Sequence, residues 1–477
     1  MFWIIAGTYC RLLIRERVLP VALAVFVAAM IYPILRGQRR IAEERLTETA
    51  FLQRAHEVVI RNQQLARGIE ERIAAGVERE QIPPPFGTRH PRYAATWSRP
   101  PAILPISSLS WLAIGQSRLY AAGYAGPEHD EIASIANPLK LRIGDWDMAF
   151  AAVYLVPLFV FGLGFDLIAS DRETGRLQLA LSQPVHARAI LRARAFATAV
   201  IVIGAVALVY AAGVAVSDNV AADGMFARAV AGGLAIAFYA IFWLALTVAI
   251  NTVGQNAAEN AMDLMALWLL FVILMPFVID QIATRAYPVP AHSEVTDARR
   301  EAPQELQTLS RDQLISEYLR HQLSLPASTN GLSELALLYL ERTARAALLN
   351  ERIEVVQQRW EDHLAGQQDL VNRLAILSPA ALLTSSLTEL AGTSRSRYLD
   401  FVRQKRDYDE SYERYFLPML LALPNSIFQS SDYDRIPIMH YSEMPAASVW
   451  RGVVFPFIGL AVIAAVAIII ALKVAVR

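Results

Sequence analysis

Charged and apolar residues form an ordered pattern in Ser170–Leu191, SDRETGRLQLALSQPVHARAIL, between two long apolar runs. Ser170 and Glu173 have the S-x-x-E spacing of a capping box, in which two side chains bond free backbone N–H groups at the start of a helix. Pro184 has no N–H group and would end such a helix. Apolar side chains recur between these limits at helical spacing: Leu177, Ala180 and Leu181. The pattern predicts one short amphipathic helix with a charged start.

This helix has two possible roles. An amphipathic helix can dock into the groove of another protein, and it can also lie in the lipid interface without a partner. If it docks, we expect Glu173 and Arg176 to reach charged residues of the partner. Leu177 and Leu181 would then fill an apolar groove.

Motifs for other chemistry do not occur in the sequence. None of the 477 residues forms the phosphate loop GxxxxGK[ST], and HExxH, GxSxG and CxxC are also missing. We therefore expect no ATPase site, no other enzyme activity and no cofactor bound by this chain. The single cysteine, Cys10, excludes an intrachain disulfide.

Two groups of side chains have the chemistry of metal ligands. Glu128–Glu131, EHDE, offers carboxylates and an imidazole, and IMHYSEM places Met439, His440 and Met444 close together. Thioether and imidazole ligands suit copper. Because short acidic or methionine-containing loops are common, we predict no metal site and keep Met439, His440 and Met444 only as a lead.

The candidate residues above are connected by apolar stretches that are long enough to cross a membrane. The chain is 55% hydrophobic, and a spanning helix needs about 20 mostly apolar residues. Six stretches qualify: 18–36, 147–168, 195–217, 227–250, 263–281 and 449–472. They predict an all-α, polytopic membrane protein with six transmembrane helices. The formal net charge of zero predicts no attraction to nucleic acid.

Arginines in the short loops predict the orientation, because Lys and Arg are enriched in cytoplasmic loops. The 218–226 loop has two aspartates and no lysine or arginine. The 169–194 loop instead carries five arginines: Arg172, Arg176, Arg188, Arg192 and Arg194. This asymmetry places 169–194 and both termini in the cytoplasm. The basic residues are nearly all arginine, a composition that suggests a bacterial source, so we expect the membrane to be the bacterial inner membrane. Arg36, Arg39 and Arg40 follow the first span and argue the other way.

The spans divide the chain into membrane parts and insertions. An interfacial helix and the first span occupy 1–36. The second to fifth spans occupy 147–281, with the cytoplasmic helix at 170–185 between two of them. The sixth span and a short tail form 449–477.

Two large and mainly helical insertions, 37–146 and 282–448, lie on the extracytoplasmic side. We expect the first to open as a continuation of the first span. The second should contain a long helix over 333–377, with breaks at Pro379 and near Gly392. The insertions form either a helical cap over the spans or a stalk that meets a periplasmic partner.

The segment 170–194 resembles the cytoplasmic segment of ABC-2-type transporter permeases, in which an E-x-G-x-L core precedes L-x-S-x-P-V. The matching positions are Glu173, Gly175, Leu177, Leu181, Ser182, Pro184 and Val185. Other stretches resemble one subfamily whose permeases carry a large, helical extracytoplasmic insert of undefined function: LPISSLSWLAIGQSRLY, NPLKLRIGDWDMAF, LSPAALLTSSLTELAGTSRSRYLDFVRQ and YDRIPIMHYSE.

The resemblance implies the permease subunit of an ATP-binding cassette exporter. A separate cytosolic ATPase dimer would hold ATP and Mg, and would move the second and third spans through the 170–185 helix. A second permease copy, identical or paralogous, would complete the assembly. The ATPase-coupling residues would be the seven matching positions together with Arg176. The alternative is a non-transporting membrane scaffold or receptor with a helical periplasmic binding domain.

Overall fold

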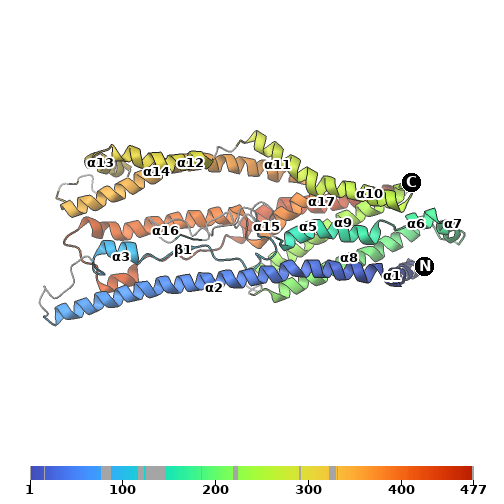
Figure 1. Ribbon diagram of the computed structural model, residues 1–477, viewed down its shortest axis with the longest axis horizontal. Coiled ribbons are helices and arrows are strands. Elements are labelled where there is room, and N and C mark those ends of the chain that lie inside the picture. The colour runs from blue at the N-terminus through green and yellow to red at the C-terminus, as the bar shows by residue number, and fades with distance from the viewer. Residues whose placement is uncertain are drawn as a thin grey trace.

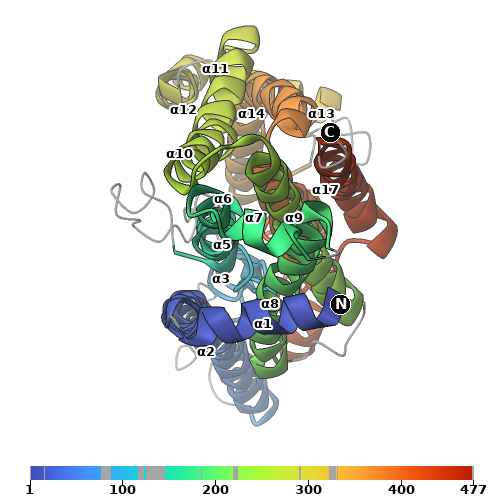
Figure 2. The ribbon, with the colours of Figure 1, turned by 90° about the vertical axis from the view of Figure 1, so that its right-hand side faces the viewer.

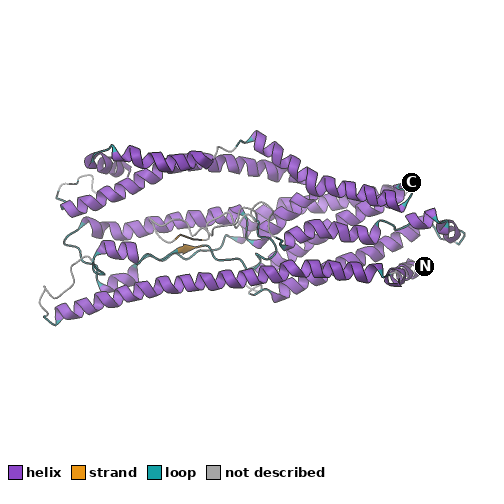
Figure 3. Ribbon diagram, viewed as in Figure 1, coloured by secondary structure: helices purple, strands orange, loops and turns teal. Residues whose placement is uncertain are grey.

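The computed structural model describes residues 2–15, 17–76, 87–115, 123–124, 146–183, 185–218, 224–288, 292–321, 329 and 331–474. These residues are mainly helical (Figure 3). Two short strands, β1 (Ala102–Ile103) and β2 (Gly123–Tyr124), form an antiparallel pair in which Ala102 lies opposite Tyr124. The all-helical prediction is confirmed.

Six helical segments of the described chain are long and apolar enough to cross a membrane. One of these segments consists of two α-helices, α10 (Ala257–Trp268) and α11 (Met275–Ala286). A π-helical stretch, η3 (Leu269–Leu274), joins them. The other five are α2 (Val18–Ala74), α5 (Met148–Gly164), α8 (Ala187–Val216), α9 (Met225–Val253) and α17 (Ala446–Val474). Each contains most of one predicted span, so the prediction of six spans is confirmed.

The molecule is elongated, with the spans at one end and further helices at the other (Figure 1). α1 (Phe2–Arg15), α6 (Ala169–Glu173) and α7 (Arg176–Leu181) lie at the extreme of the membrane half, where α17 also ends. We call this the basal end. Among the described residues, the opposite half, the distal helical region, includes the far part of α2 together with α3 (Pro91–Trp97), α12 (His292–Gln307), α13 (Arg311–His321), α14 (Glu334–Leu374) and α16 (Arg395–Leu421).

The helix α2 runs along one side of the molecule through both halves (Figure 1). Its 57 residues make a rod about 85 Å long, at 1.5 Å per residue. The first span therefore continues into the distal helical region, as the sequence predicts. At its distal end the Glu70 carboxylate accepts hydrogen bonds from the Ser430 backbone N–H, at 2.8 Å, and from its hydroxyl, at 2.6 Å.

Local capping residues determine where the helices of the second insertion begin and end. Ser333 accepts a bond from the backbone N–H of Ala336 and starts α14. A short 3₁₀ turn, η4 (Ala375–Leu377), separates α14 from α15 (Pro379–Ala391), which ends at Gly392 with a φ of 70°. The predicted breaks at Pro379 and Gly392 are therefore found. α15 packs against α5, α9 and α17, so part of this insertion returns to the spans.

Aromatic side chains form the core of the distal helical region. α16 contributes four buried rings, Phe401, Tyr408, Tyr412 and Phe416, which pack with Phe428 and Tyr433. The guanidinium of Arg99 lies 4.5 Å from the ring centroid of Tyr412 and 2.5 Å from the Asp409 carboxylate. A desolvated cation beside an aromatic face and a carboxylate holds the segment around Arg99 on α16.

The segment 107–115 inserts one buried tryptophan between two helices. Trp111 is fully buried, between α2 and α8. A Cβ added at Gly37 would lie 2.7 Å from the Trp111 Cβ, and one at Gly213 would lie 2.6 Å from its Cη2. α2 therefore needs glycine where the Trp111 backbone approaches it, and α8 needs glycine where the indole ring lies. Nearby, the Ala149 N–H donates to the Leu112 carbonyl at 2.7 Å.

Trp111→Ala removes the largest side chain at this junction. We expect it to cost about 3–5 kcal/mol, because the rigid helices on either side leave a cavity. Denaturation of the detergent-solubilised chain measures the loss. Trp97→Ala is the matched control, because Trp97 is 61% exposed and its removal should cost less than about 0.5 kcal/mol. Equal losses for the two variants would contradict the assigned role of Trp111.

The histidine that caps α3, His90, should make the stability of the fold depend on pH. The His90 Nδ1 accepts a bond from the Arg92 backbone N–H at 3.2 Å, which needs a neutral ring. Burial, and then the charge of Arg92, lower the pKa of His90 below 6.5. The unfolded chain therefore takes up the proton first, and stability is lost as the pH falls below 6.5 toward the folded pKa.

Asparagine also caps helices but does not titrate. His90→Asn should therefore reduce the loss of thermal stability on acidification from about pH 8 to about pH 5. His363→Asn, at an exposed position of α14, should leave this loss unchanged. If His90→Asn and the wild type lose equal stability on acidification, His90 is not the titrating group.

Candidate functional site

The segment singled out in the sequence folds as two short helices, α6 (Ala169–Glu173) and α7 (Arg176–Leu181). This corrects the prediction of one helix over 170–185. The break occurs at Gly175, whose φ of 71° lies in the left-handed region that glycine adopts without steric cost. The turn changes the direction of the chain, so the faces expected for a single helix do not apply.

The predicted capping box does not form. Ser170 lies inside α6, and Ile168 is the N-cap residue. The Ser170 backbone N–H donates to Asp166 Oδ1 at 2.6 Å, and its hydroxyl donates to Asp166 Oδ2. Because the earlier carboxylate already satisfies these donors, Glu173 is available to bond elsewhere.

Glu173 binds the start of another span. Its Oε1 accepts a hydrogen bond at 2.7 Å from the backbone N–H of Ala257, in the first turn of α10. A carboxylate is favourable there, because free N–H groups and the helix dipole make the start of a helix positive. Arg172 donates to the carbonyl of Gly254, the residue that follows α9. The turn between α9 and α10 is therefore bonded to α6.

Two buried asparagines hold the basal end of α5. The Asn251 Oδ1 accepts from the Leu167 N–H at 2.9 Å, and its Nδ2 donates to the Gly164 carbonyl at 2.8 Å. Asn260 donates to the Phe165 carbonyl at 3.1 Å. Our sequence interpretation missed both residues. A polar amide within an apolar stretch was the available signal.

A second set of contacts ties α6 and α7 to α8 and α1. Asp171 pairs with Arg194 at 2.5 Å and with Arg176 at 3.2 Å. Arg194 also donates to the Leu167 carbonyl at 2.6 Å, and its guanidinium lies 5.3 Å from the ring centroid of Tyr9 on α1. α1, α6, α7 and the start of α8 therefore form one connected unit, which Figure 2 shows from the basal end.

A model of the ABC-2 family transporter proteins matches residues 3–476. The chain belongs to this family. It is therefore the membrane component of a transporter, a multi-pass protein with six candidate spans, and such permeases generally pair with ATPase subunits. Permeases of this family typically lack an ATPase domain. No curated protein matches the chain significantly.

In α7 of this ABC-2 family chain, the exposed leucines differ from those that the sequence predicted, Leu177 and Leu181. Leu177 is 9% exposed and packs with Leu167 and Ile190, whereas Leu179 is 73% exposed and Leu181 is 42% exposed. The sequence interpretation passed over Leu179 because it followed the apolar stripe of Leu177, Ala180 and Leu181, whose spacing does not include Leu179. The structure thus turns Leu177 toward α1 and α8 and leaves Leu179 and Leu181 at the surface.

The remaining residues of the segment lie along its edge. The Arg176 side chain is 62% exposed. Ser182 is exposed and donates to the Leu179 carbonyl at 2.7 Å, while Val185 packs beside Leu177. Pro184 is outside the described residues.

Met439 and Met444, two of the three side chains kept as a metal lead, pack in different parts of the structure. Met439 packs in the distal aromatic core, whereas Met444 packs with Ala231 and Val449. His440 is exposed. Among the described residues, no group of three or more His, Cys, Asp or Glu side chains could hold a metal ion. Glu128–Glu131 lies outside those residues.

Gly175→Ala tests the turn between α6 and α7. Nothing lies within 4 Å of a Cβ added there, so the cost comes from the backbone alone, about 1–2 kcal/mol. Asparagine tolerates the left-handed conformation better, so Gly175→Asn should recover part of the stability. Thermal denaturation in detergent measures both. The turn is not needed if Gly175→Ala denatures at the wild-type temperature.

Proposed function

We propose that this chain is the permease subunit of an ATP-binding cassette exporter and that a separate cytosolic ATPase dimer docks on α7. The supporting observation is the exposed surface of Arg176, Leu179 and Leu181 on a segment that is bonded to several spans. A partner that hydrolyses ATP must do mechanical work on the membrane helices. It therefore needs a contact surface that does not move independently of them.

The contacts of this segment give a route into four spans. A force on α7 reaches α8 through Asp171 and Arg194. It reaches the turn between α9 and α10 through Arg172 and Glu173. The end of α5 follows, because the buried asparagines of α9 and α10 bind its carbonyls. The proposed coupling thus includes more spans than the second and third.

The structure suggests different tasks for the motif residues. Arg176, Leu179 and Leu181 would contact the ATPase, while Glu173 and Leu177 would position the segment from inside. Gly175 makes the turn, and Ser182 and Val185 lie between α7 and α8. ATP and Mg would be held by the ATPase, with a second permease copy beside this one.

We also propose a bacterial inner membrane location with the basal end in the cytoplasm. The arginines of 169–194 support this orientation. α1, α6, α7 and the last described turn of α17 also lie at the same end of the molecule. The distal helical region would then be extracytoplasmic. Membership of a transporter family supports transport rather than a scaffold or receptor role.

Leu179→Asp tests the docking surface. Full burial of a leucine contributes about 1.5–3 kcal/mol, so the variant should reduce the ATPase recovered with the tagged permease from its native membrane by about tenfold or more. The recovered ATPase is quantified relative to the permease on the same gel.

Ala258→Asp is the matched control. It adds the same charge on an exposed position of α10 at the basal end but outside α7, and should leave recovery unchanged. Equal recovery with both variants would show that α7 is not the docking surface. If the wild type itself recovers no ATPase, the proposed partnership fails.

A further inference from the structure

Three stretches that carry the resemblance to the insert subfamily meet near the starts of α9 and α17. Arg397, which is 6% exposed, connects all three. Its Nη2 donates to the Pro105 carbonyl at 2.9 Å, and its Nε donates to Oε2 of Glu443 at 3.1 Å. We call these residues, together with Arg228 and Glu389, the outer cluster. The coupling proposal makes no use of it.

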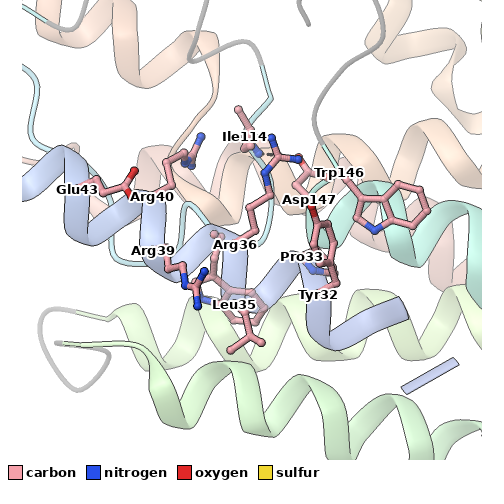
Figure 4. A pocket seen from close by; sticks show the side chains of 12 residues that line it. Tyr32, Pro33, Leu35, Arg36, Arg39, Arg40, Glu43, Ile114, Trp146 and Asp147 are labelled. Carbon is pink, nitrogen blue, oxygen red and sulfur yellow. Dashed lines mark hydrogen bonds between the residues drawn. The ribbon is translucent and has the colours of Figure 1, made fainter. Parts of the chain in front are cut away.

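The stretch that contains Pro105 is anchored on the side of α2 and α5. It forms one wall of a pocket of about 440 Å³, together with α2 and the start of α5 (Figure 4). The Asp147 Oδ2 accepts from the Ile114 N–H at 2.8 Å. The Thr393 hydroxyl donates to the Ala113 carbonyl at 2.9 Å, so the turn after α15 is bonded to a segment that α5 holds.

The Glu389 carboxyl lies directly against α17. It belongs to the last turn of α15, which packs on α17 and α9. A Cβ added at Gly452 would lie 3.1 Å from the Glu389 Cδ and 3.2 Å from its Oε2. Because Gly452 has no side chain, the carboxyl can reach the backbone of α17, where it loses part of its contact with water.

Hydroxyl groups, and not a cation, are the near partners of this carboxyl. The Ser396 hydroxyl donates to the Glu389 carboxylate, at 3.1 Å from Oε2 and 3.4 Å from Oε1. Among the described residues, no Lys, Arg or His nitrogen lies within 4.0 Å of the Glu389 carboxylate. The ionised form has therefore lost water without gaining an ion pair, which makes it the less favourable form.

Arg228 is the one charged residue of α9, and it is 6% exposed. Its positive charge is attracted more strongly to Glu443 than to Glu389, and Arg397 repels it. Arg228 therefore opposes the protonation of Glu389 only weakly.

Other charges around α15 are few or already have partners. On α17, the Arg451 guanidinium donates to the Ala447 carbonyl at 3.3 Å and to the Ser448 hydroxyl at 3.2 Å. Lys473 lies at the opposite end of α17. α5, η3 and η4 also pack on α15 and contain no charged residue. Burial raises the pKa of Tyr441 to about 12, so its hydroxyl stays neutral.

Protonation of Glu389 is therefore linked to how closely α15 packs on α17. Burial raises the pKa of Glu389 above 4.5, and this effect exceeds the lowering by the Ser394 and Ser396 hydroxyls and by the charge of Arg228. The folded chain thus holds this proton more tightly than the unfolded chain. The contribution to stability is fully present below pH 4.5 and is lost as the pH rises through the folded pKa.

We propose that the outer cluster is a pH-responsive latch. Protonated Glu389 keeps α15 packed against Gly452 of α17. When the carboxyl gives its proton to water, the carboxylate becomes hydrated and α15 loosens from α17. The pH on the distal side of the membrane then sets how firmly the second insertion holds the starts of α9 and α17. The latch does not require the ATPase to be bound.

Hydrogen exchange of the purified full-length chain in detergent tests the latch. Exchange is read in peptides from α15 and from the start of α17, because His90 affects the overall stability over part of the same pH range. From about pH 5 to about pH 9, the protection of these peptides, corrected for the intrinsic effect of pH, should fall at least about threefold in the wild type. Glu389→Gln cannot ionise, so its protection should stay constant over this range.

Ser396→Ala should move the transition in a defined direction. The Ser396 hydroxyl stabilises the ionised carboxyl, so its loss should raise the pH midpoint by about half a unit or more. Ser396 is exposed, so this variant gives a folded protein even if Glu389→Gln does not.

Glu351→Gln, at an exposed position of α14, is the matched control and should behave like the wild type. The latch is refuted if protection in the wild type does not fall with rising pH, or if it falls equally in Glu389→Gln. A midpoint that does not rise in Ser396→Ala also overturns it.

Discussion

Backbone groups at the basal end of α5 must find hydrogen-bond partners where water is scarce, and much of the described basal end depends on this constraint. An unsatisfied backbone group in an apolar environment costs several kcal/mol. Asn251 and Asn260 meet the requirement from α9 and α10, and Arg194 meets it from α8. As a result, the chain that leaves α5 is bound to three other spans before α6 begins. These hydrogen bonds fix the point at which the α6–α7 segment begins, and therefore its position.

The features that the sequence predicted well are those with local causes. Runs of apolar residues identify the six spans, and Ser333, Pro379 and Gly392 act on the backbone within a turn of their own position. The features that it could not predict depend on distant partners. Trp111 needs glycines on two separate helices, and the role of Glu173 depends on where α10 begins. Neither partner is visible from the spacing of nearby residues.

The orientation of α7 shows how one backbone dihedral alters an interpretation of side chains. Counting at helical spacing from Ser170 places Leu177 and Leu181 on a common outer face. The positive φ of Gly175 turns α7 as a whole relative to α6 without changing the spacing within α7, and Leu177 packs inward while Leu179 faces out. The motif of the family is therefore a combination of inward and outward residues. The matching positions identify the segment without separating residues that touch a partner from residues that hold the segment in place.

The length of α2 has a mechanical consequence. A straight rod of about 85 Å that tilts by about 5° at one end displaces its other end by about 7 Å. α2 is packed against α5 and α8 in the membrane half and is bonded to Ser430 near its tip. A small change in the packing of the spans would thus be enlarged into a movement of the segment around Ser430. The length of α2 would then make it a lever arm between the membrane and the far end of the molecule.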